Sequence, residues 1–161
     1  LDTDALASQS FSVNDLVMDI SNIFKSSLYI THNIKSNLHL NNNTGVVHAS
    51  KNTVKQIITN IIKNAVEAMV SGGTLDISTN NININGKYFV DIEVRDTGSG
   101  ISEEVLKNLF LPITSTKGNG HSGLGLSIVK NLMDSVGGLI GCRTNESGTV
   151  FNIQIPGEIN K

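Results

Sequence analysis

The chain has 161 residues, of which 39% are hydrophobic and 16% are charged, and its formal net charge at pH 7 is −2. This length is sufficient for one domain with a substantial hydrophobic core, and the small net charge excludes a strongly basic surface of the kind that draws proteins to nucleic acids or anionic membranes. No apolar run approaches the ~20 residues of a membrane-spanning helix, and no secretory signal pattern is present.

The N-terminal half of the sequence predicts helices separated by short strands. Helices are expected over residues 14–32 and 52–70, and strands over residues 34–40 and 46–50. The first helix has its apolar stripe at Leu16, Ile20, Ile23 and Phe24. Ser12 or Asn14 can cap this helix. The second helix has one broad apolar arc, formed by Val54, Ile57, Ile58, Ile61, Ile62, Ala65, Ala68 and Met69.

The C-terminal half predicts a hairpin, two helices and a closing hairpin. The expected elements are strands over 74–80 and 87–96, a helix over 102–110, a glycine-rich loop over 114–125, a helix that ends at Gly137-Gly138, and a final pair of strands around "NESG". Asn85-Gly86 is a strong turn signal between the first two strands. This order predicts an α/β sandwich in which helices cover one face of a mixed sheet.

The strand over residues 87–96 ends in "DTGSG", which begins at Asp96 and fits two kinds of chemistry. Asp-Thr-Gly is typical of aspartic proteases, but these need two carboxylates that share one proton, and the chain has one such tripeptide. Asp-x-Gly-x-Gly at a strand end is typical of some ATP sites. The carboxylate can accept a hydrogen bond from an exocyclic amine, and Gly98 and Gly100 let a flat ring approach the backbone. A purely structural turn is the remaining interpretation.

Polar residues lie along the margin of the long second helix. Asn60 and Asn64 are four residues apart and share a face, and Glu67 lies on the same side. Polar groups at such a margin need partners, and amide oxygens suit Mg²⁺, an ion that keeps several waters and also binds phosphates. Two solvated asparagines in an Asn-rich chain are the alternative.

The third candidate element is the glycine-rich loop and the helix that follows it. Gly123 and Gly125 stand at the start of this helix, where free N–H groups and the helix dipole favour an anion. Lys117 precedes them and can reach a phosphate. The spacing fits neither a Walker loop nor a dinucleotide-binding fingerprint. A loop that is merely flexible is the alternative.

In chain order these motifs resemble those of the GHKL ATPases, and specifically the catalytic ATP-binding domain of bacterial sensor histidine kinases. The matching stretches are "NIIKNAVEA" (60–68, N box), "DTGSGI" (96–101, G1 box), "LFLPITSTK" (109–117, F box), "SGLGLSIVK" (122–130, G2 box) and "SGTVFNIQIP" (147–156, closing strand). The resemblance implies a two-layer α/β (α+β) sandwich with a mixed, mostly antiparallel sheet and about three helices on one face. It also implies a catalytic domain over residues 11–161, preceded by the tail of a dimerisation segment over residues 1–10.

The resemblance implies a role for each matching residue, with ATP and Mg²⁺ as the bound groups. Asp96 holds the adenine amino group, Gly98, Gly100 and Ile101 shape the adenine pocket, and Thr149 lies near the ring. Asn64 coordinates Mg²⁺, Asn60 lies by the phosphates, and Glu67 helps to orient the waters of the metal. Lys117, Gly123, Leu124 and Gly125 form the ATP lid and the phosphate site. Two departures fall in or beside the lid, where Ile113 and His121 replace the usual phenylalanine and glycine.

Position 60 favours a kinase over a hydrolase. Gyrase-like relatives have a glutamate there to activate water, whereas Asn60 has no basic function. Slow attack by water suits an enzyme that passes the phosphoryl group to another nucleophile. The alternatives are a nucleotide-gated ATPase module and a serine kinase of the anti-sigma type.

The resemblance further implies a histidine acceptor, but His32, His39, His48 and His121 all lack the acidic residue and proline that usually follow one. We therefore expect the acceptor on dimerisation helices outside this chain, which begins with Leu1. A homodimeric parent and a response-regulator receiver domain are the implied partners. The single cysteine, Cys142, lies in an apolar stretch and is expected to be a buried structural thiol. Without a secretory signal, the expected setting is the reducing cytoplasm.

Overall fold

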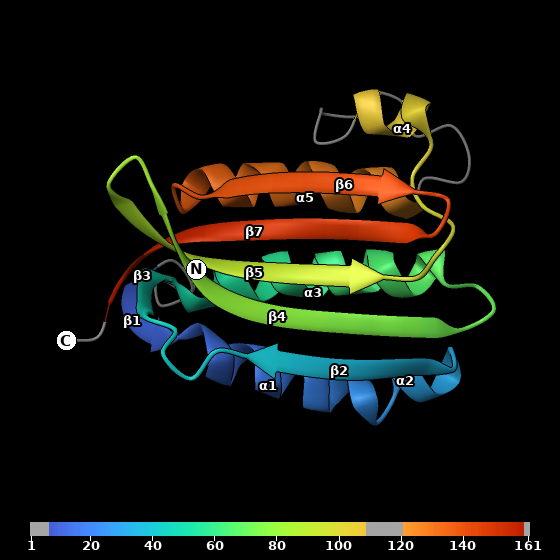
Figure 1. Ribbon diagram of the computed structural model, residues 1–161, viewed down its shortest axis with the longest axis horizontal. Helices are drawn as coiled ribbons and strands as arrows, with labels where there is room; N and C mark the ends of the chain where they lie inside the picture. The colour runs from blue at the N-terminus through green and yellow to red at the C-terminus, as the bar shows by residue number, and fades with distance from the viewer. Residues whose placement is uncertain (1–6, 109–120, 160–161) are drawn as a thin grey trace.

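The computed structural model describes residues 7–108 and 121–159, which form a sheet with a layer of helices on one side (Figure 1). The strands are β1 (Ser8–Ser12), β2 (Ile34–Leu40), β3 (Val46–Ser50), β4 (Gly73–Ile84), β5 (Lys87–Asp96), β6 (Leu139–Asn145) and β7 (Gly148–Glu158). The helices are α1 (Val13–Lys25), α2 (Leu28–Thr31), α3 (Lys51–Ala68), α4 (Glu103–Lys107) and α5 (His121–Ser135). This arrangement confirms the predicted two-layer α/β sandwich.

The strands of the described residues form one mixed sheet in the order β1-β3-β7-β5-β4-β2, and β6 also pairs with β7. The β2–β4 pair is parallel, and the other pairs are antiparallel. Asn85 and Gly86 both have positive φ in the turn between β4 and β5, as the sequence predicts. The register pairs Asp96 with Thr149, so the end of β5 lies beside the start of β7.

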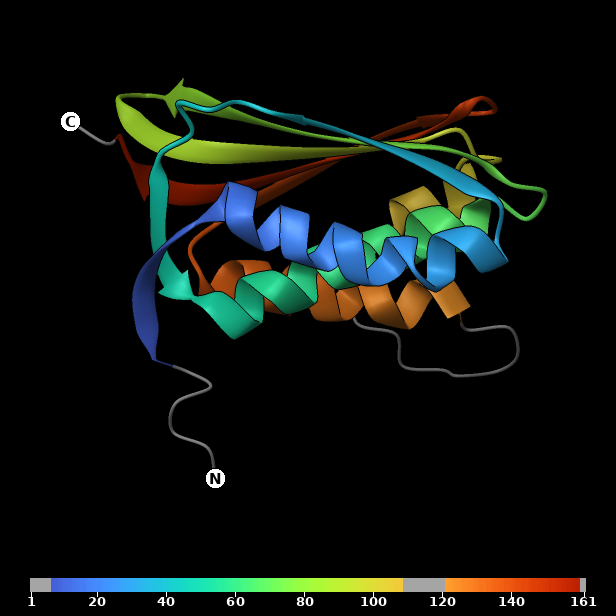
Figure 2. The same ribbon diagram turned by 90° about the horizontal axis from the view of Figure 1, so that it is seen from below.

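Helices α1, α3 and α5 lie side by side on one face of the sheet (Figure 2). Helix α3 is the central one, and its predicted apolar arc packs into the core. Its buried residues are Val54, Ile57, Ile58, Ile61, Ile62, Ala65 and Val66. Each buried isoleucine contributes about 1.5–3 kcal/mol through removal of apolar surface from water. The Oγ of Ser50 caps the helix by accepting a hydrogen bond from the N–H of Thr53 over 3.3 Å.

The predicted continuous helix over residues 14–32 is wrong, because the chain forms α1 and α2 with a break between them. The hydroxyls of Ser26 and Ser27 both donate to the carbonyl oxygen of Ile23, over 3.0 and 3.1 Å. Such side-chain bonds compete with the helical ladder. Ile23, which the sequence placed on the apolar stripe, is 56% exposed, because the buried face of α1 follows Val13, Leu16, Val17, Ile20 and Ser21.

The N-terminal strand ties the start of the described chain to the sheet. Strand β1 pairs antiparallel with β3 from Ser8 onward, and Ser12 at its end caps α1 by accepting the N–H of Asp15. The sheet therefore begins before residue 11. Across residues 7–108 and 121–159, no helix has both the length and the apolar character needed to cross a bilayer.

Candidate functional site

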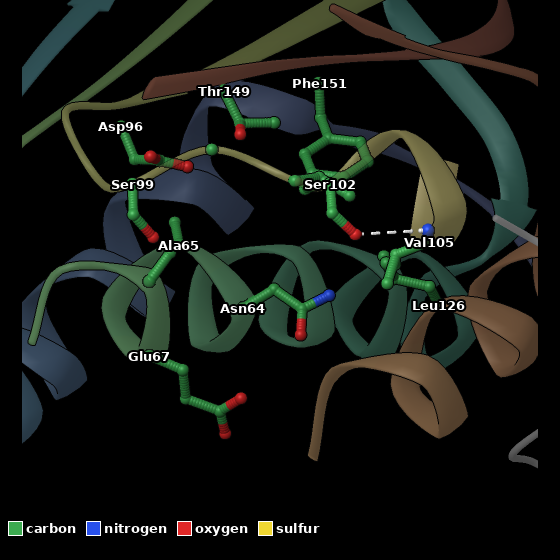
Figure 3. A pocket seen from close by; sticks show the side chains of 13 residues that line it. Asn64, Ala65, Glu67, Asp96, Ser99, Ser102, Val105, Leu126, Thr149 and Phe151 are labelled. Atoms are coloured by element: carbon green, nitrogen blue, oxygen red, sulfur yellow. Dashed lines mark hydrogen bonds between the residues drawn. The ribbon is translucent and has the colours of Figure 1, made fainter. Parts of the chain in front are cut away.

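A cavity of about 290 Å³ lies between the C-terminal half of α3, the end of β5 and the start of β7 (Figure 3). Its walls are formed by Asn64, Ala65, Glu67, Ala68, Asp96, Ser99, Gly100, Ile101, Ser102, Val105, Leu126, Thr149 and Phe151. The structure thus brings together residues from four of the five sequence motifs, which lie on different elements. The walls combine an apolar lining with a few polar groups, as small-molecule sites usually do.

Asp96 is the buried carboxylate of this cavity. It is the last residue of β5, is 5% exposed, and points into the cavity from the sheet side, as does Thr149 (Figure 3). Its Oδ1 accepts the backbone N–H of Gly98 over 2.8 Å. Burial raises the pKa of Asp96, and hydrogen bonds from the backbone of Gly98 and Thr149 partly offset that rise. A carboxylate in this position is a directional acceptor for a donor on a ligand.

The loop after Asp96 is packed tightly between α3 and the β6–β7 hairpin. A Cβ on Gly98 would lie 2.7 Å from the carbonyl oxygen of Ala68, and the next residue donates its N–H to that oxygen over 3.3 Å. Gly100 has φ of +79°, and a Cβ there would meet the carbonyl oxygen of Asn145. Close packing against neighbouring backbone therefore explains why both positions are glycine. The sequence predicts a different reason, namely that these glycines let a flat ring approach the backbone. Gly100 lies on the cavity wall, whereas Gly98 lies behind it.

Helix α3 places Asn64 on the wall opposite the sheet (Figure 3). Its Nδ2 is buried and has no hydrogen-bond partner among the described residues. Glu67 also borders the cavity, but it is exposed, and Figure 3 shows its carboxylate directed away from Asp96. Asn60 lies one turn before Asn64, is partly buried, and is not on the wall.

The donor chemistry of Asn64 fits the predicted magnesium ion. An amide oxygen is a hard ligand, and Mg²⁺ commonly takes one or two protein ligands while waters and phosphates fill the other positions. Within the described parts of the chain, no three His, Cys, Asp or Glu side chains gather as a metal site. The amide oxygen of Asn64 could therefore supply one ligand to such an ion, with waters and phosphates in the other positions.

Helix α5 reaches the cavity through Leu126, which follows the predicted phosphate-site residues Gly123, Leu124 and Gly125 in the chain. Leu126 is 2% exposed and forms part of the wall. Gly125 has open space where a Cβ would stand, so packing within the described chain does not require glycine at this position. Gly123 and Leu124 lie in the first turn of α5. Lys117 and Ile113, with the rest of the F box, lie outside the described residues.

Several wall residues were not predicted, namely Ala65, Ala68, Ser99, Ser102, Val105, Leu126 and Phe151. Phe151 lies two residues after Thr149 on the same strand, and strand periodicity places both on one face. Ala65 and Ala68 belong to the predicted apolar arc of α3. Phe151, Ala65 and Ala68 could therefore have been predicted from their spacing to the motif residues. Ser102 also caps α4 by accepting the N–H of Val105 over 3.3 Å, so its hydroxyl is in part structural.

Cys142 lies on β6 and is partly buried. Burial raises the pKa of its thiol to about 11, and the charge of Asp96 adds to the rise. The thiol therefore stays protonated at neutral pH and is a poor nucleophile, which agrees with the structural role that the sequence predicts.

Residues 49–159 match the family model of histidine kinase-, DNA gyrase B- and HSP90-like ATPases. Sporulation kinase A of Bacillus subtilis is 39% identical over 111 residues, which cover 68% of this chain and 18% of that protein. Sporulation kinase D of the same organism is 34% identical over 147 residues, which cover 90% of this chain and 28% of that protein. The chain thus spans less than a third of either relative.

Among solved structures, the chain is similar to the catalytic domain of the histidine kinase ThkA in a nucleotide-free form. The TM-score is 0.79 at 30% identity, and the match covers 93% of this chain and 97% of that chain. A second structure holds ThkA in complex with the response regulator TrrA, and it matches with a TM-score of 0.75 at 28% identity, over 95% of this chain and 42% of that chain.

Proposed function

This chain belongs to the family of histidine kinase-, DNA gyrase B- and HSP90-like ATPases, and on that premise we propose that it is the ATP-binding catalytic domain of a sensor histidine kinase. Binding of ATP follows from the family. The proposed reaction is transfer of the γ-phosphoryl group to a histidine on a dimerisation domain outside this chain.

The buried carboxylate of Asp96 carries the proposal. It faces the cavity from the end of β5 with one oxygen engaged by Gly98, and Thr149 lies beside it on β7. An exocyclic amine that donates to this carboxylate would satisfy it at low cost, because hydrogen bonds to charged groups are the stronger ones. We infer that Asp96, Gly100, Ile101 and Thr149 surround the adenine, and that Gly98 fixes the loop from behind.

The phosphate end of the site is assigned to α3 and α5. Asn64 would hold Mg²⁺, which neutralises charge on the phosphates when bound. Gly123 and Leu124 in the first turn of α5 would offer backbone N–H groups to the phosphates, and Gly125 follows as the fifth residue of this helix. Lys117 remains a predicted contact of the lid. This end of the site orients the chain of phosphates relative to the acceptor.

A general base is missing from the proposed site at position 60. Asn60 cannot take a proton from water, and Glu67 directs its carboxylate away from Asp96 (Figure 3). Glu67 would act at most on the waters of the metal. These features support transfer to a histidine over hydrolysis, and they disfavour a nucleotide-gated ATPase module.

Titration with a non-hydrolysable ATP analogue, with and without Mg²⁺, tests the site. We expect binding in both conditions and tighter binding with Mg²⁺. Autophosphorylation of the parent protein that is stable in base and labile in acid would identify phosphohistidine. Rapid steady-state hydrolysis by this chain would favour the ATPase alternative, and phosphorylation of a protein serine would favour the serine kinase alternative.

The proposal extends to the parent protein. We propose that residues 1–10 lead from a dimerisation segment into the catalytic domain of residues 11–161, with the start of β1 at Ser8 already part of the sheet of that domain. We also propose that the parent is a homodimer acting in the cytoplasm and that the phosphoryl group passes to a receiver domain. The complex of ThkA with the response regulator TrrA supports such a partner. Light scattering on the parent and phosphotransfer to purified receiver domains test these points.

A further inference from the structure

The hydroxyl of Thr144 connects two residues of the cavity wall, Ile101 and Thr149, with the β6–β7 turn. Thr144 lies on β6, and its Oγ1 accepts the backbone N–H of Ile101 over 2.8 Å. The same oxygen lies 2.9 Å from Oγ1 of Thr149 and 3.3 Å from the carbonyl oxygen of Gly148. One side chain therefore connects the loop after β5, the β6–β7 turn and a hydroxyl that faces the cavity.

The position of the Thr144 proton sets the direction of this chain of hydrogen bonds. A hydroxyl has one proton and two lone pairs, and one lone pair of Thr144 is used by the N–H of Ile101. Accepting this bond makes Thr144 a better donor, because hydrogen bonds in a chain polarise one another. Its proton has two possible acceptors, Oγ1 of Thr149 at 2.9 Å and the carbonyl oxygen of Gly148 at 3.3 Å. Only donation to Thr149 leaves the proton of Thr149 free to point into the cavity, and this is the direction that the proposed role of Thr144 requires.

The sheet register places this chain of hydrogen bonds beside the buried carboxylate. Asp96 pairs with Thr149, and Thr149 pairs with Thr144, so the three residues form one row across β5, β7 and β6. Thr149 is 3% exposed and lines the cavity. The row therefore presents an acceptor on Asp96 next to a donor on Thr149.

This pair of groups matches one kind of purine edge. Adenine has an amine donor next to an unprotonated ring nitrogen. Hypoxanthine and guanine have a carbonyl next to a protonated ring nitrogen, which reverses both polarities. A site that is built to pair with polar groups discriminates strongly against an analogue that leaves them unpaired.

We propose that Thr144 is a positioning residue that determines base specificity, because it holds the hydroxyl of Thr149 with its proton toward the cavity. This inference rests on the proposed nucleotide site and adds a residue that none of the sequence motifs contains. Thr144 acts through Thr149 and through the loop at Ile101, and it need not touch the nucleotide.

Thr144→Val tests the inference, because valine keeps the shape of threonine and its β-branch and lacks the hydroxyl. Affinities for ADP and for inosine 5′-diphosphate are measured by calorimetry in Mg²⁺-free buffer at 25 °C. The wild-type chain should prefer ADP. In Thr144→Val, the affinity for ADP should fall about tenfold, which is the effect of one lost hydrogen bond. The ratio of the inosine 5′-diphosphate dissociation constant to the ADP dissociation constant should fall by a similar factor. Thr144→Ser keeps the hydroxyl and should retain the wild-type preference within about twofold.

A purely structural role predicts a different pattern. The melting temperature would fall, and the affinities for ADP and inosine 5′-diphosphate would decrease by the same factor. An unchanged preference for ADP in a folded Thr144→Val variant therefore overturns the inference. In a Thr149→Val background, Thr144→Val should cause no further narrowing, and a further loss would contradict the proposed chain. Should the valine variant fail to fold, Thr144→Cys applies the same test, because a thiol is a weak donor and acceptor.

The wild-type measurement separates the two proposals. If the wild-type chain binds neither nucleotide, the proposed function fails, and the role of Thr144 fails with it. If the wild-type chain prefers ADP and the valine variant keeps that preference, the role of Thr144 alone is overturned.

Discussion

Replacement of Asp96 by asparagine separates ligand binding from folding. Asparagine has the same shape as aspartate, and its carbonyl oxygen can still accept the N–H of Gly98, which aspartate accepts over 2.8 Å. Its amide group, however, would face the exocyclic amine of adenine with a donor of its own. The variant should therefore keep the loop in place and lose the acceptor that the nucleotide needs.

The magnitude follows from the charge and burial of Asp96, which is 5% exposed. A hydrogen bond to a charged group contributes about 1.5–3 kcal/mol, so Asp96→Asn should weaken ADP binding about 10- to 150-fold. The free energy of unfolding should change in the opposite direction, because Asp96→Asn removes a buried charge at neutral pH. Because burial raises the pKa of Asp96, the folded state binds the proton more tightly than the unfolded state. The free energy of unfolding therefore falls as pH rises from the ordinary aspartate pKa through the raised value, and the ionised carboxylate destabilises the fold above it.

Calorimetric titration with ADP and urea unfolding between pH 4 and pH 7 provide the assay. Asp91→Asn is the matched control. Asp91 lies on the same strand, is 9% exposed, and also has a pKa raised by burial. It occupies the opposite face of the sheet, where it accepts hydrogen bonds from Asn152. Asp91→Asn should leave ADP affinity unchanged.

Two results would refute this reasoning. Unchanged ADP affinity in a folded Asp96→Asn variant would remove the carboxylate from the adenine site. Equal losses of affinity in the variants at positions 91 and 96 would show that the effect comes from the sheet as a whole. In either variant, the fall in unfolding free energy with rising pH should be smaller than in the wild-type chain.

Three further substitutions test other parts of the site. Asn64→Ala should abolish the gain in nucleotide affinity on adding Mg²⁺ and change Mg²⁺-free binding less than about threefold; an intact gain would exclude Asn64 as the ligand. Gly125→Ala should raise the free energy of unfolding by about 0.5–1 kcal/mol, because alanine favours a helix and its Cβ would meet open space. It should also weaken ATP binding, and unchanged binding would take the first turns of α5 out of the phosphate site. Gly98→Ala should cost about 1–3 kcal/mol by overpacking, since the new Cβ would lie 2.7 Å from the carbonyl oxygen of Ala68; urea unfolding that shows no loss would contradict the packing role.

The fold was predictable because its main signals are local. The apolar arc of α3, the Asn85-Gly86 turn and the alternation in β5 all appear within short stretches of sequence, and each produced the expected element. The break between α1 and α2 was not predictable from spacing. The apolar pattern continues through it, and the break depends on two adjacent serines that compete for the carbonyl of Ile23.

The site was predictable only in part, for a related reason. The motifs pointed to Asp96 and Asn64, the family resemblance added Thr149, and the cavity brings these three together. Thr144 escaped notice because its role depends on the register of β6 against β7 and on a contact with Ile101, which is 43 residues away in the chain. No local pattern marks such a residue. Side chains that connect separate segments become visible only when the strands are paired.

The Asp-x-Gly-x-Gly motif shows why a structural turn and a ligand site were hard to distinguish from sequence. The loop is held at three points: Asp96 accepts the N–H of Gly98, the carbonyl of Ala68 accepts the N–H of Ser99, and Thr144 accepts the N–H of Ile101. The first of these bonds uses Oδ1 of the carboxylate, and the backbone of Thr149 also donates to this carboxylate. Asp96 therefore shapes the turn and also lines the cavity. The two interpretations are therefore not exclusive. The turn fixes the direction of the carboxylate, and in the proposed site that fixed direction would let a buried acceptor select the edge of a purine.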